Sequence, residues 1–112
     1  MKTNHQAGHD KEKLAANYLT ANGYKILDLN WRTKYCEIDI IAKNNNRLYF
    51  YEVKSRASNA QGFGYEYVTP KKLEKMKFAA ELWVAANHWK GEYQLAVASV
   101  DDDKIQLFDE LG

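Results

Sequence analysis

The chain has 112 residues, of which 46% are hydrophobic and 28% charged, and its formal net charge is +1. This length predicts one domain around one core, and the composition is typical of a soluble globular protein. No apolar run reaches the length of a membrane span, and residues 1–13 lack the apolar segment of a signal peptide, so we expect a cytoplasmic protein with no membrane partner.

Residues 9–22 predict the first helix, which follows a flexible N-terminus at 1–8. Asp10 is placed to cap this helix, and Gly23 is placed to end it. Apolar residues recur at helical spacing, and the stripe that they form consists of Ala15, Ala16 and Leu19. We therefore expect this helix to pack against a sheet.

Three strands follow the first helix. The segments 24–30, 36–42 and 47–55 are rich in β-branched and aromatic residues, and the polar residues 43–46 predict a hairpin turn between the last two. Short connections join antiparallel strands. We therefore expect these strands to form an antiparallel meander.

A long connector precedes the second helix. Residues 56–69 contain two glycines and several aromatic residues, and a connector of this length favours a functional, mobile loop. Thr69 and Pro70 have the chemistry of a helix start, and we expect the helix to continue to about Lys90, with Gly91 ending it. Its predicted packing face comprises Leu73, Met76, Ala80, Trp83 and Val84.

Two further strands are predicted, a buried one at 92–100 and a short edge strand at 104–108. The resulting order is α, β, β, β, α, β, β. Such an order is typical of an α/β domain in which helices pack on a mixed sheet. We expect residues 1–112 to form this single domain, with an acidic C-terminal segment at 101–112.

The small net charge hides an asymmetry along the chain. Residues 101–112 hold five acids and one lysine, which leaves residues 1–100 with fifteen bases, ten acids and a net charge of +5. A basic body suits a polyanionic partner, although proteins that bind no nucleic acid also reach this charge. Cys36 is the chain's one cysteine, which agrees with a reducing compartment and predicts a packed small residue.

The strand at 47–55 carries charge where its core face should continue. Side chains alternate along a strand, so Glu52 and Lys54 follow Leu48 and Phe50 on the same face. Burying ions is costly unless they are paired or bound. One interpretation is that the strand emerges into water at this end, and the other is that the two charges belong to a functional site.

The preceding strand shows the same feature, because Glu37 and Asp39 share a face of an otherwise apolar segment. Two such carboxylates repel each other unless a cation or a lysine neutralises them. An edge strand with one wet face is the alternative. If the predicted hairpin pairs these strands, Asp39 comes close to Glu52 and Lys54, and such a cluster suits Mg²⁺.

Glu12 adds a further acid. It shares a helix face with Ala15, Ala16 and Leu19, so it should point toward the sheet. The alternative is an acid of the first turn that interacts favourably with the helix dipole.

The motif E-I-D at 37–39, followed by E-V-K at 52–54, resembles the PD-(D/E)xK superfamily of metal-dependent nucleases. The resemblance is closest to its YraN-like branch, which is similar to archaeal Holliday-junction resolvases, and it covers about residues 8–100. The segments that match, in order, are KEKLAANYL, NGYKILDLNWR, CEIDIIA, YFYEVKSR and VTPKKLEKM. The resemblance implies a restriction-endonuclease-like three-layer core, with a mixed sheet flanked by helices.

The same resemblance implies roles for five residues. Asp39 and Glu52 would bind the metal, Mg²⁺ or Mn²⁺, and Lys54 would be the catalytic lysine. Glu12 would be an accessory acid, and Glu37 an auxiliary carboxylate.

The chain departs from the pattern of this branch at four positions. Lys11 and Cys36 replace glycines, and Gln94 and Ala96 stand where an arginine and an aspartate are usual. Two hypotheses follow. The first is an endonuclease-like enzyme that hydrolyses phosphodiesters in nucleic acid, with DNA, including branched DNA, as the expected substrate; the second is an inactive module with the nuclease fold that binds nucleic acid or a protein partner. The oligomeric state stays open, a homodimer included.

Basic residues near the expected site are candidates for phosphate contacts, and a solvated lysine face is the alternative. Arg56 follows Lys54 on the same strand face. The second helix begins with several lysines, and its N-terminal amides could also meet phosphate. The predicted nucleic-acid-binding residues are Arg56, Lys71, Lys72 and Lys75.

Overall fold

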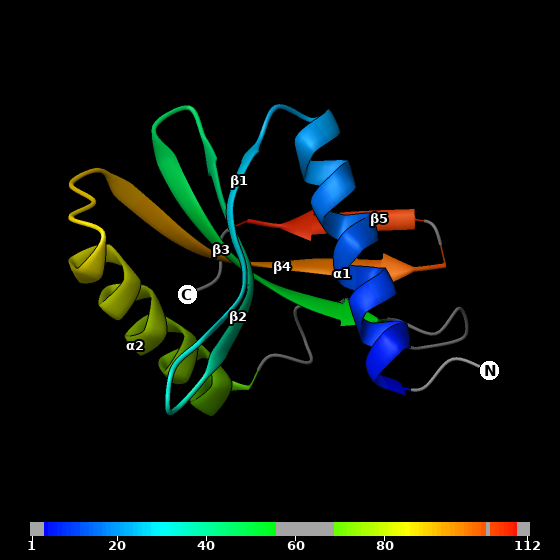
Figure 1. The fold of residues 1–112 in the computed structure, drawn as a ribbon, viewed down its shortest axis with the longest axis horizontal. Coiled ribbons are helices and arrows are strands. Elements are labelled where there is room, and N and C mark those ends of the chain that lie inside the picture. Colours follow the sequence, from blue (N-terminus) through cyan, green and yellow to red (C-terminus); the bar gives the residue numbers. More distant parts are fainter. Residues whose placement is uncertain (1–3, 56–68, 103, 110–112) are drawn as a thin grey trace.

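The computed structural model describes residues 4–55, 69–102 and 104–109 (Figure 1). The predicted order of elements is confirmed. They are α1 (Asn4–Ala21), β1 (Lys25–Arg32), β2 (Glu37–Asn44), β3 (Arg47–Ser55), α2 (Pro70–Ala86), β4 (Glu92–Asp101) and β5 (Lys104–Phe108). Neither of these two helices is long and apolar enough to cross a membrane. The predicted mobile loop at 56–69 lies, apart from its last residue, outside the described part of the chain.

The five described strands form a mixed sheet in the order β1-β2-β3-β4-β5. β1, β2 and β3 make the predicted antiparallel meander. β4 lies parallel to β3, and β5 pairs antiparallel with β4 at the edge. Since parallel neighbours need a long crossover, α2 lies in the connection between β3 and β4. The predicted α/β class is confirmed.

The two helices cover opposite faces of this sheet (Figure 1). One core cluster joins Leu19 of α1 to Ile40 of β2. The other joins Met76 of α2 to Ile41, the next residue of β2, because neighbouring strand residues face opposite ways. All four side chains are fully buried, which stabilises the fold by about 1.5–3 kcal/mol each. The predicted apolar stripes of both helices are confirmed.

The first helix extends further toward the N-terminus than predicted. α1 begins at Asn4, so the predicted later start and the role of Asp10 as N-cap are wrong. Proline is the residue that disfavours a helix most, and residues 4–10 contain none, so α1 can extend ahead of Asp10. At the other end the prediction is confirmed, since Gly23 has a φ of +90°. The Tyr24 N–H donates to the Leu19 carbonyl at 3.0 Å, which closes the helix.

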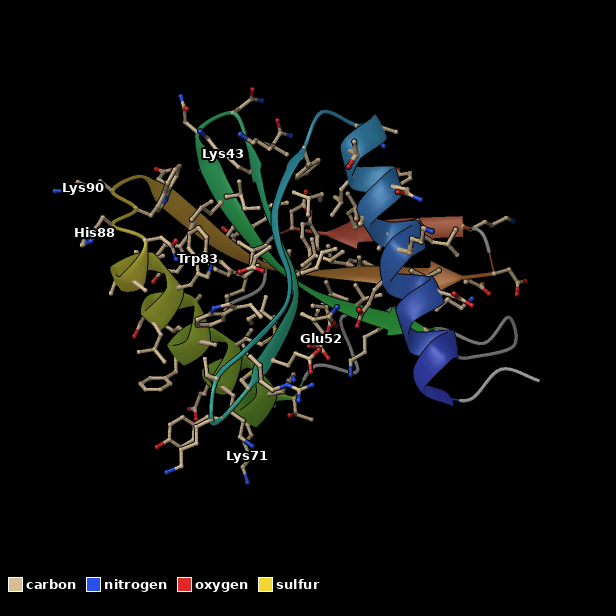
Figure 2. The ribbon with its side chains drawn as sticks, viewed as in Figure 1. Lys43, Glu52, Lys71, Trp83, His88 and Lys90 are labelled. Carbon is tan, nitrogen blue, oxygen red and sulfur yellow. The ribbon has the colours of Figure 1, made fainter. Side chains whose placement is uncertain are left out.

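The start of α2 is confirmed and its end is not. Thr69 caps the helix, because its Oγ1 accepts a backbone N–H of the first turn. The helix ends at Ala86, so the predicted later end at Gly91 is wrong. His88, which follows this end in Figure 2, adopts a left-handed φ of +53°, and the Trp89 N–H closes the helix behind it. A non-glycine residue thus occupies the position at which glycine is most common.

The predicted turn joins β2 and β3. Asn45 and Asn46 have φ values of +50° and +65°. Two residues in the left-handed region make a type I′ hairpin turn, and asparagine tolerates this conformation better than most residues. The turn sets the register, with Asn44 opposite Arg47. β3 occupies the range predicted from the sequence.

Beyond this hairpin, β2 and β3 separate. Their pairing ends where Ile40 lies opposite Tyr51. Residues 37–38 of β2 remain paired with β1, while residues 52–55 of β3 remain paired with β4. The start of β2 and the end of β3 therefore diverge like the arms of a fork (Figure 1). The acids predicted for the site lie at this fork.

Candidate metal centre

Asp39 lies where β2 and β3 part. It precedes Ile40, the last residue of β2 that pairs with β3. Its Oδ2 accepts the Val53 N–H at 2.7 Å. A side-chain carboxylate thus bonds a β3 amide beyond the end of the strand ladder, which fixes the Asp39 carboxylate at the fork.

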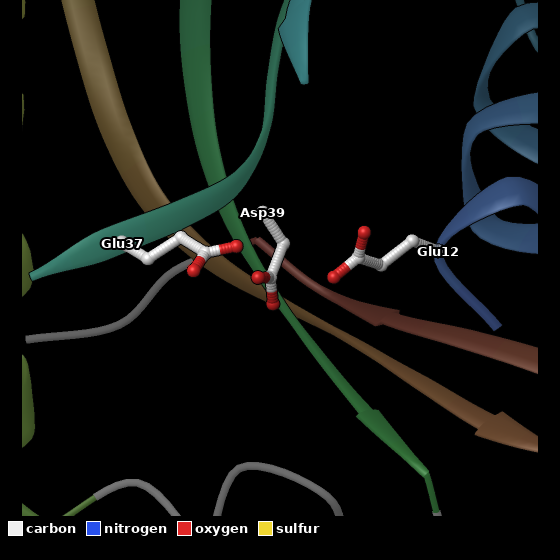
Figure 3. A group of neighbouring side chains, drawn as sticks. All are labelled: Glu12, Glu37 and Asp39. Atoms are coloured by element: carbon white, nitrogen blue, oxygen red, sulfur yellow. The ribbon is translucent and has the colours of Figure 1, made fainter. Parts of the chain in front are cut away.

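Three carboxylates converge at the fork (Figure 3). Glu37 and Asp39 come from one face of β2, and Glu12 reaches them from α1. One carboxylate oxygen of each lies within 4.8 Å of the others, and all three residues are partly buried. Glu12 is placed there because the apolar stripe of α1 packs on the sheet. We call these three residues the acidic cluster.

Burial and neighbouring charges change the proton affinity of Asp39. Burial is the main reason why the pKa of Asp39 rises from 3.8 to about 7. The Val53 N–H opposes this rise, because it stabilises the ionised form. Like charges raise the pKa further, namely those of Glu52, Glu12 and Glu37.

The donor set fits a hard divalent cation. Carboxylate oxygens are the ligands that Mg²⁺ and Mn²⁺ prefer in proteins. A cation between the three acids would offset the repulsion that raises the Asp39 pKa. Glu37 also accepts a hydrogen bond from Arg32 at 2.7 Å, but the Arg32 side chain is largely exposed and compensates little of this charge.

Glu52 lies next to the acidic cluster but has different partners. Its side chain is buried, with 8% of the residue exposed. Lys54 Nζ lies 3.3 Å from its Oε1, and Lys72 Nζ lies 3.4 Å from its Oε2. The resemblance to the nuclease superfamily implied that Glu52 and Asp39 are both metal ligands. In the structure Glu52 lies near enough to Asp39 for its charge to raise the Asp39 pKa.

Cys36 lies beside Lys72. It is buried in the core on the α2 side, which confirms the prediction of a packed small residue. Its Sγ lies 3.9 Å from Lys72 Nζ. Burial raises the pKa of the Cys36 thiol, Lys72 lowers it, and the charges of Glu52 and Asp39 raise it. The thiol is therefore held in its neutral form at neutral pH.

Two of the other departures from the nuclease pattern, Lys11 and Ala96, have contacts of their own. Lys11 Nζ donates to the Asp102 carbonyl at 3.3 Å, between α1 and the turn after β4. Ala96 is fully buried in the cluster on the α1 side of the sheet. It pairs with Tyr51, so its side chain lies on the opposite face from Glu52.

The predicted phosphate-contact residues are not all alike. Arg56 lies outside the described residues. Lys71 and Lys75 are exposed on α2, whereas Lys72 is partly buried and reaches Glu52. The α2 amides are less available than predicted, because the Lys72 N–H donates to Thr69 Oγ1 and the Leu73 N–H donates to the Thr69 carbonyl. The sequence missed the Lys72 to Glu52 contact, since the two residues belong to different elements.

The raised pKa of Asp39 predicts how stability changes with pH in the absence of metal. The folded state binds a proton at Asp39 up to about pH 7, whereas the unfolded chain releases it near pH 4. Stability from this group is therefore present at low pH and lost as the pH rises through 7. We expect urea titrations in EDTA to show a loss of about 2–3 kcal/mol between pH 5 and pH 8 that Asp39→Asn lacks. If the wild type and Asp39→Asn lose the same free energy of unfolding over this pH range, the raised pKa does not belong to Asp39.

Comparison of sequences shows which family the chain matches. A sequence model of the uncharacterised protein family UPF0102 matches residues 11–108. A UPF0102 protein of Cytophaga hutchinsonii is 38% identical over 102 residues, which cover 91% of this chain and 90% of the relative. One of Sulfurihydrogenibium sp. is 38% identical, covering 89% and 88%. One of Clostridioides difficile is 42% identical, covering 76% and 75%.

Proposed function

The chain belongs to the UPF0102 family, and from its acidic cluster we propose that it is a metal-dependent, endonuclease-like phosphodiester hydrolase of nucleic acid. The proposal includes membership of the PD-(D/E)xK superfamily, with a restriction-endonuclease-like core. The observation that carries it is the convergence of Glu12, Glu37 and Asp39 within 4.8 Å. The family names of the relatives state no activity, so the proposal depends on the geometry and on the sequence motifs.

The acidic cluster would hold Mg²⁺ or Mn²⁺. A bound ion of this kind polarises a phosphoryl oxygen and lowers the pKa of a coordinated water. The Val53 N–H fixes one oxygen of Asp39 at 2.7 Å. Glu12 and Glu37 approach it from two different elements, which suits a cation held between a helix and a strand.

Lys54 and Glu52 would act on the substrate side of the centre. Lys54 follows Glu52 on the same strand face, and about a third of its side chain is exposed. An ammonium group at this position can donate hydrogen bonds to a phosphate oxygen and stabilise the charge that develops there. Glu52 holds this ammonium group at 3.3 Å until a phosphate replaces it.

The proposed substrate is DNA, including branched DNA. Exposed lysines on α2 lie on the same side of the sheet as Lys54, and residues 1–100 carry a net charge of +5. Positive side chains that contact phosphates supply most of the affinity for nucleic acid and position it without reading sequence. The preference for branched structures comes from the similarity of the sequence motifs to those of junction resolvases.

A cleavage assay tests this proposal directly. We expect the protein to cleave at least one substrate in a panel of labelled DNA duplexes, flaps, four-way junctions and matched RNA, in the presence of Mg²⁺ or Mn²⁺. EDTA should stop the reaction. If a folded sample cleaves none of these substrates with either metal, the assignment as a nuclease fails.

A second candidate function is binding of nucleic acid or a protein partner without catalysis. The observation that favours it is that both oxygens of Glu52 are engaged by lysines, with Cys36 packed beside one of them. A binding module predicts DNA affinity that depends on salt but not on EDTA or on Lys54→Ala. Loss of all DNA binding on removal of the metal would exclude this candidate.

A further inference from the structure

Glu52 carries two cations that come from different parts of the fold. Lys54 is its neighbour on β3, while Lys72 extends from the first turn of α2. Each lysine lies against a different oxygen, at 3.3 Å and 3.4 Å. A buried carboxylate needs compensation of its charge, and one lysine with good geometry can provide it. The second lysine therefore calls for a separate explanation.

The α2 helix itself gives Lys72 no favourable local role. Thr69 caps the helix, and Lys72 occupies the position at which glutamate would complete a capping box. A positive charge in the first turn is disfavoured by the helix dipole, and this turn contains no acid. Partial burial also lowers the pKa of Lys72, yet Glu52, Cys36 and Asp39 together raise it above its ordinary value. The ammonium group is held by the site and not by its own helix.

Lys71 provides an internal comparison. It is the preceding residue of the same helix turn, carries the same charge, and is exposed. Figure 2 shows Lys71 at the start of α2, pointing away from the sheet, while Glu52 lies inward on β3. Two adjacent lysines of one helix turn thus differ in surroundings, since Lys72 reaches Glu52 and Lys71 is exposed.

We infer that Lys72 is a positioning residue which pairs with Glu52 while the site lacks substrate and transfers to a substrate phosphate when nucleic acid binds. The inference rests on the proposed function, because it assigns the phosphate to the same site. In the empty site, the Lys72 charge opposes a divalent cation at the nearby acidic cluster, since both are attracted by the same carboxylates. When a phosphodiester binds, Lys72 contacts it, and Glu52 becomes available to the cation. Metal binding and substrate binding therefore favour each other.

The test measures Lys72→Met in two assays that require no turnover, with Lys71→Met as the control for metal binding. Titration calorimetry with Mn²⁺ alone should show an affinity about 3- to 10-fold higher for Lys72→Met than for the wild type, and no change for Lys71→Met. Binding of a labelled DNA duplex in EDTA should lose about one unit of salt slope in Lys72→Met. Lys72→Arg should restore both values, which separates loss of charge from loss of folding.

Each result decides the inference. An unchanged Mn²⁺ affinity in Lys72→Met, with Mn²⁺ bound normally by the wild type, overturns the role of Lys72 and leaves the proposed function intact. A changed Mn²⁺ affinity with an unchanged salt slope overturns the transfer to phosphate. If the wild type binds no Mn²⁺, the metal-dependent function and this inference both fail. A wild type that binds Mn²⁺ without cleaving DNA, together with the predicted shifts, supports the inference and contradicts turnover.

Discussion

Asp39→Asn is expected to abolish binding of Mn²⁺ and, with it, metal-dependent cleavage. Asp39 is the central acid of the acidic cluster, and its carboxylate is fixed by the Val53 N–H at 2.7 Å. Asparagine has nearly the same shape and its carbonyl can accept the same hydrogen bond, but it provides no charge for the cation. We expect Mn²⁺ affinity to fall by about 100-fold or more and cleavage by about 1,000-fold.

The midpoint of thermal unfolding offers an independent test of whether Asp39→Asn loses Mn²⁺ binding. Wild-type protein should gain stability when Mn²⁺ is added, because the ion binds the folded state. Asp39→Asn should show no gain, although its stability in EDTA at pH 8 should be higher than that of the wild type, since a buried repulsive charge has been removed. A protein weakened generally by the substitution would show lower stability in both conditions.

Asp28→Asn is a matched control for this substitution. Asp28 lies on β1, and its Oδ1 accepts the Leu29 N–H at 3.0 Å, so it is also an aspartate bonded to a backbone amide. It does not belong to the acidic cluster. We expect its replacement to leave Mn²⁺ affinity unchanged. If Asp39→Asn binds Mn²⁺ as tightly as the wild type does, the cation lies outside the acidic cluster.

The elements that the sequence predicted best are those with strong local chemistry at their ends. β3 was predicted at its observed bounds because asparagines form the turn before it, and alternation marks its faces. The start of α2 was predicted because threonine followed by proline is a specific cap. The start of α1 and the end of α2 lack such chemistry, and their predicted positions were wrong. His88 adopts a conformation that sequence patterns assign to glycine, and Gly91 is instead required for close approach, since a Cβ there would lie 2.7 Å from the Trp89 ring.

The acids of the site were assigned to one site from the sequence, but the fork at which they meet was not predicted. Strand alternation placed Glu37 and Asp39 on one face, and the stripe of α1 directed Glu12 toward the sheet. Alternation does not reveal where two paired strands part. Because the pairing of β2 and β3 ends before Asp39, its carboxylate meets Glu12 and Glu37 at the fork.

The basic half of the site shows the same limit. Lys54 follows from the E-V-K motif, whereas the position of Lys72 depends on how α2 packs against the sheet. In the sequence Lys72 is one of several similar lysines, and no local pattern distinguishes it from Lys71. The distinction appears when burial and ion pairs are known, because Lys72 alone of these two contacts Glu52 in the described structure.

Lys54→Met is expected to reduce cleavage by about 100- to 1,000-fold while Mn²⁺ binding persists. Lys54 Nζ lies 3.3 Å from Glu52, and its side chain is partly exposed. Removing a preorganised positive charge from a developing negative charge costs about 2.7–4 kcal/mol of transition-state stabilisation in comparable sites. Methionine keeps much of the apolar length of lysine, so Mn²⁺ affinity should be no weaker than in the wild type.

Lys75→Met separates this effect from a general loss of charge. Lys75 is an exposed lysine of α2 for which no contact with Glu52 is observed in the described structure, so its replacement should lower the salt slope of DNA binding by about one and leave the cleavage rate at saturating DNA unchanged. A catalytic role predicts the opposite for Lys54→Met, namely a fall in the maximal rate. Equal effects of the two substitutions on both quantities would mean that Lys54 contributes affinity for the backbone and no catalysis. The binding module would then be the better account of this fold.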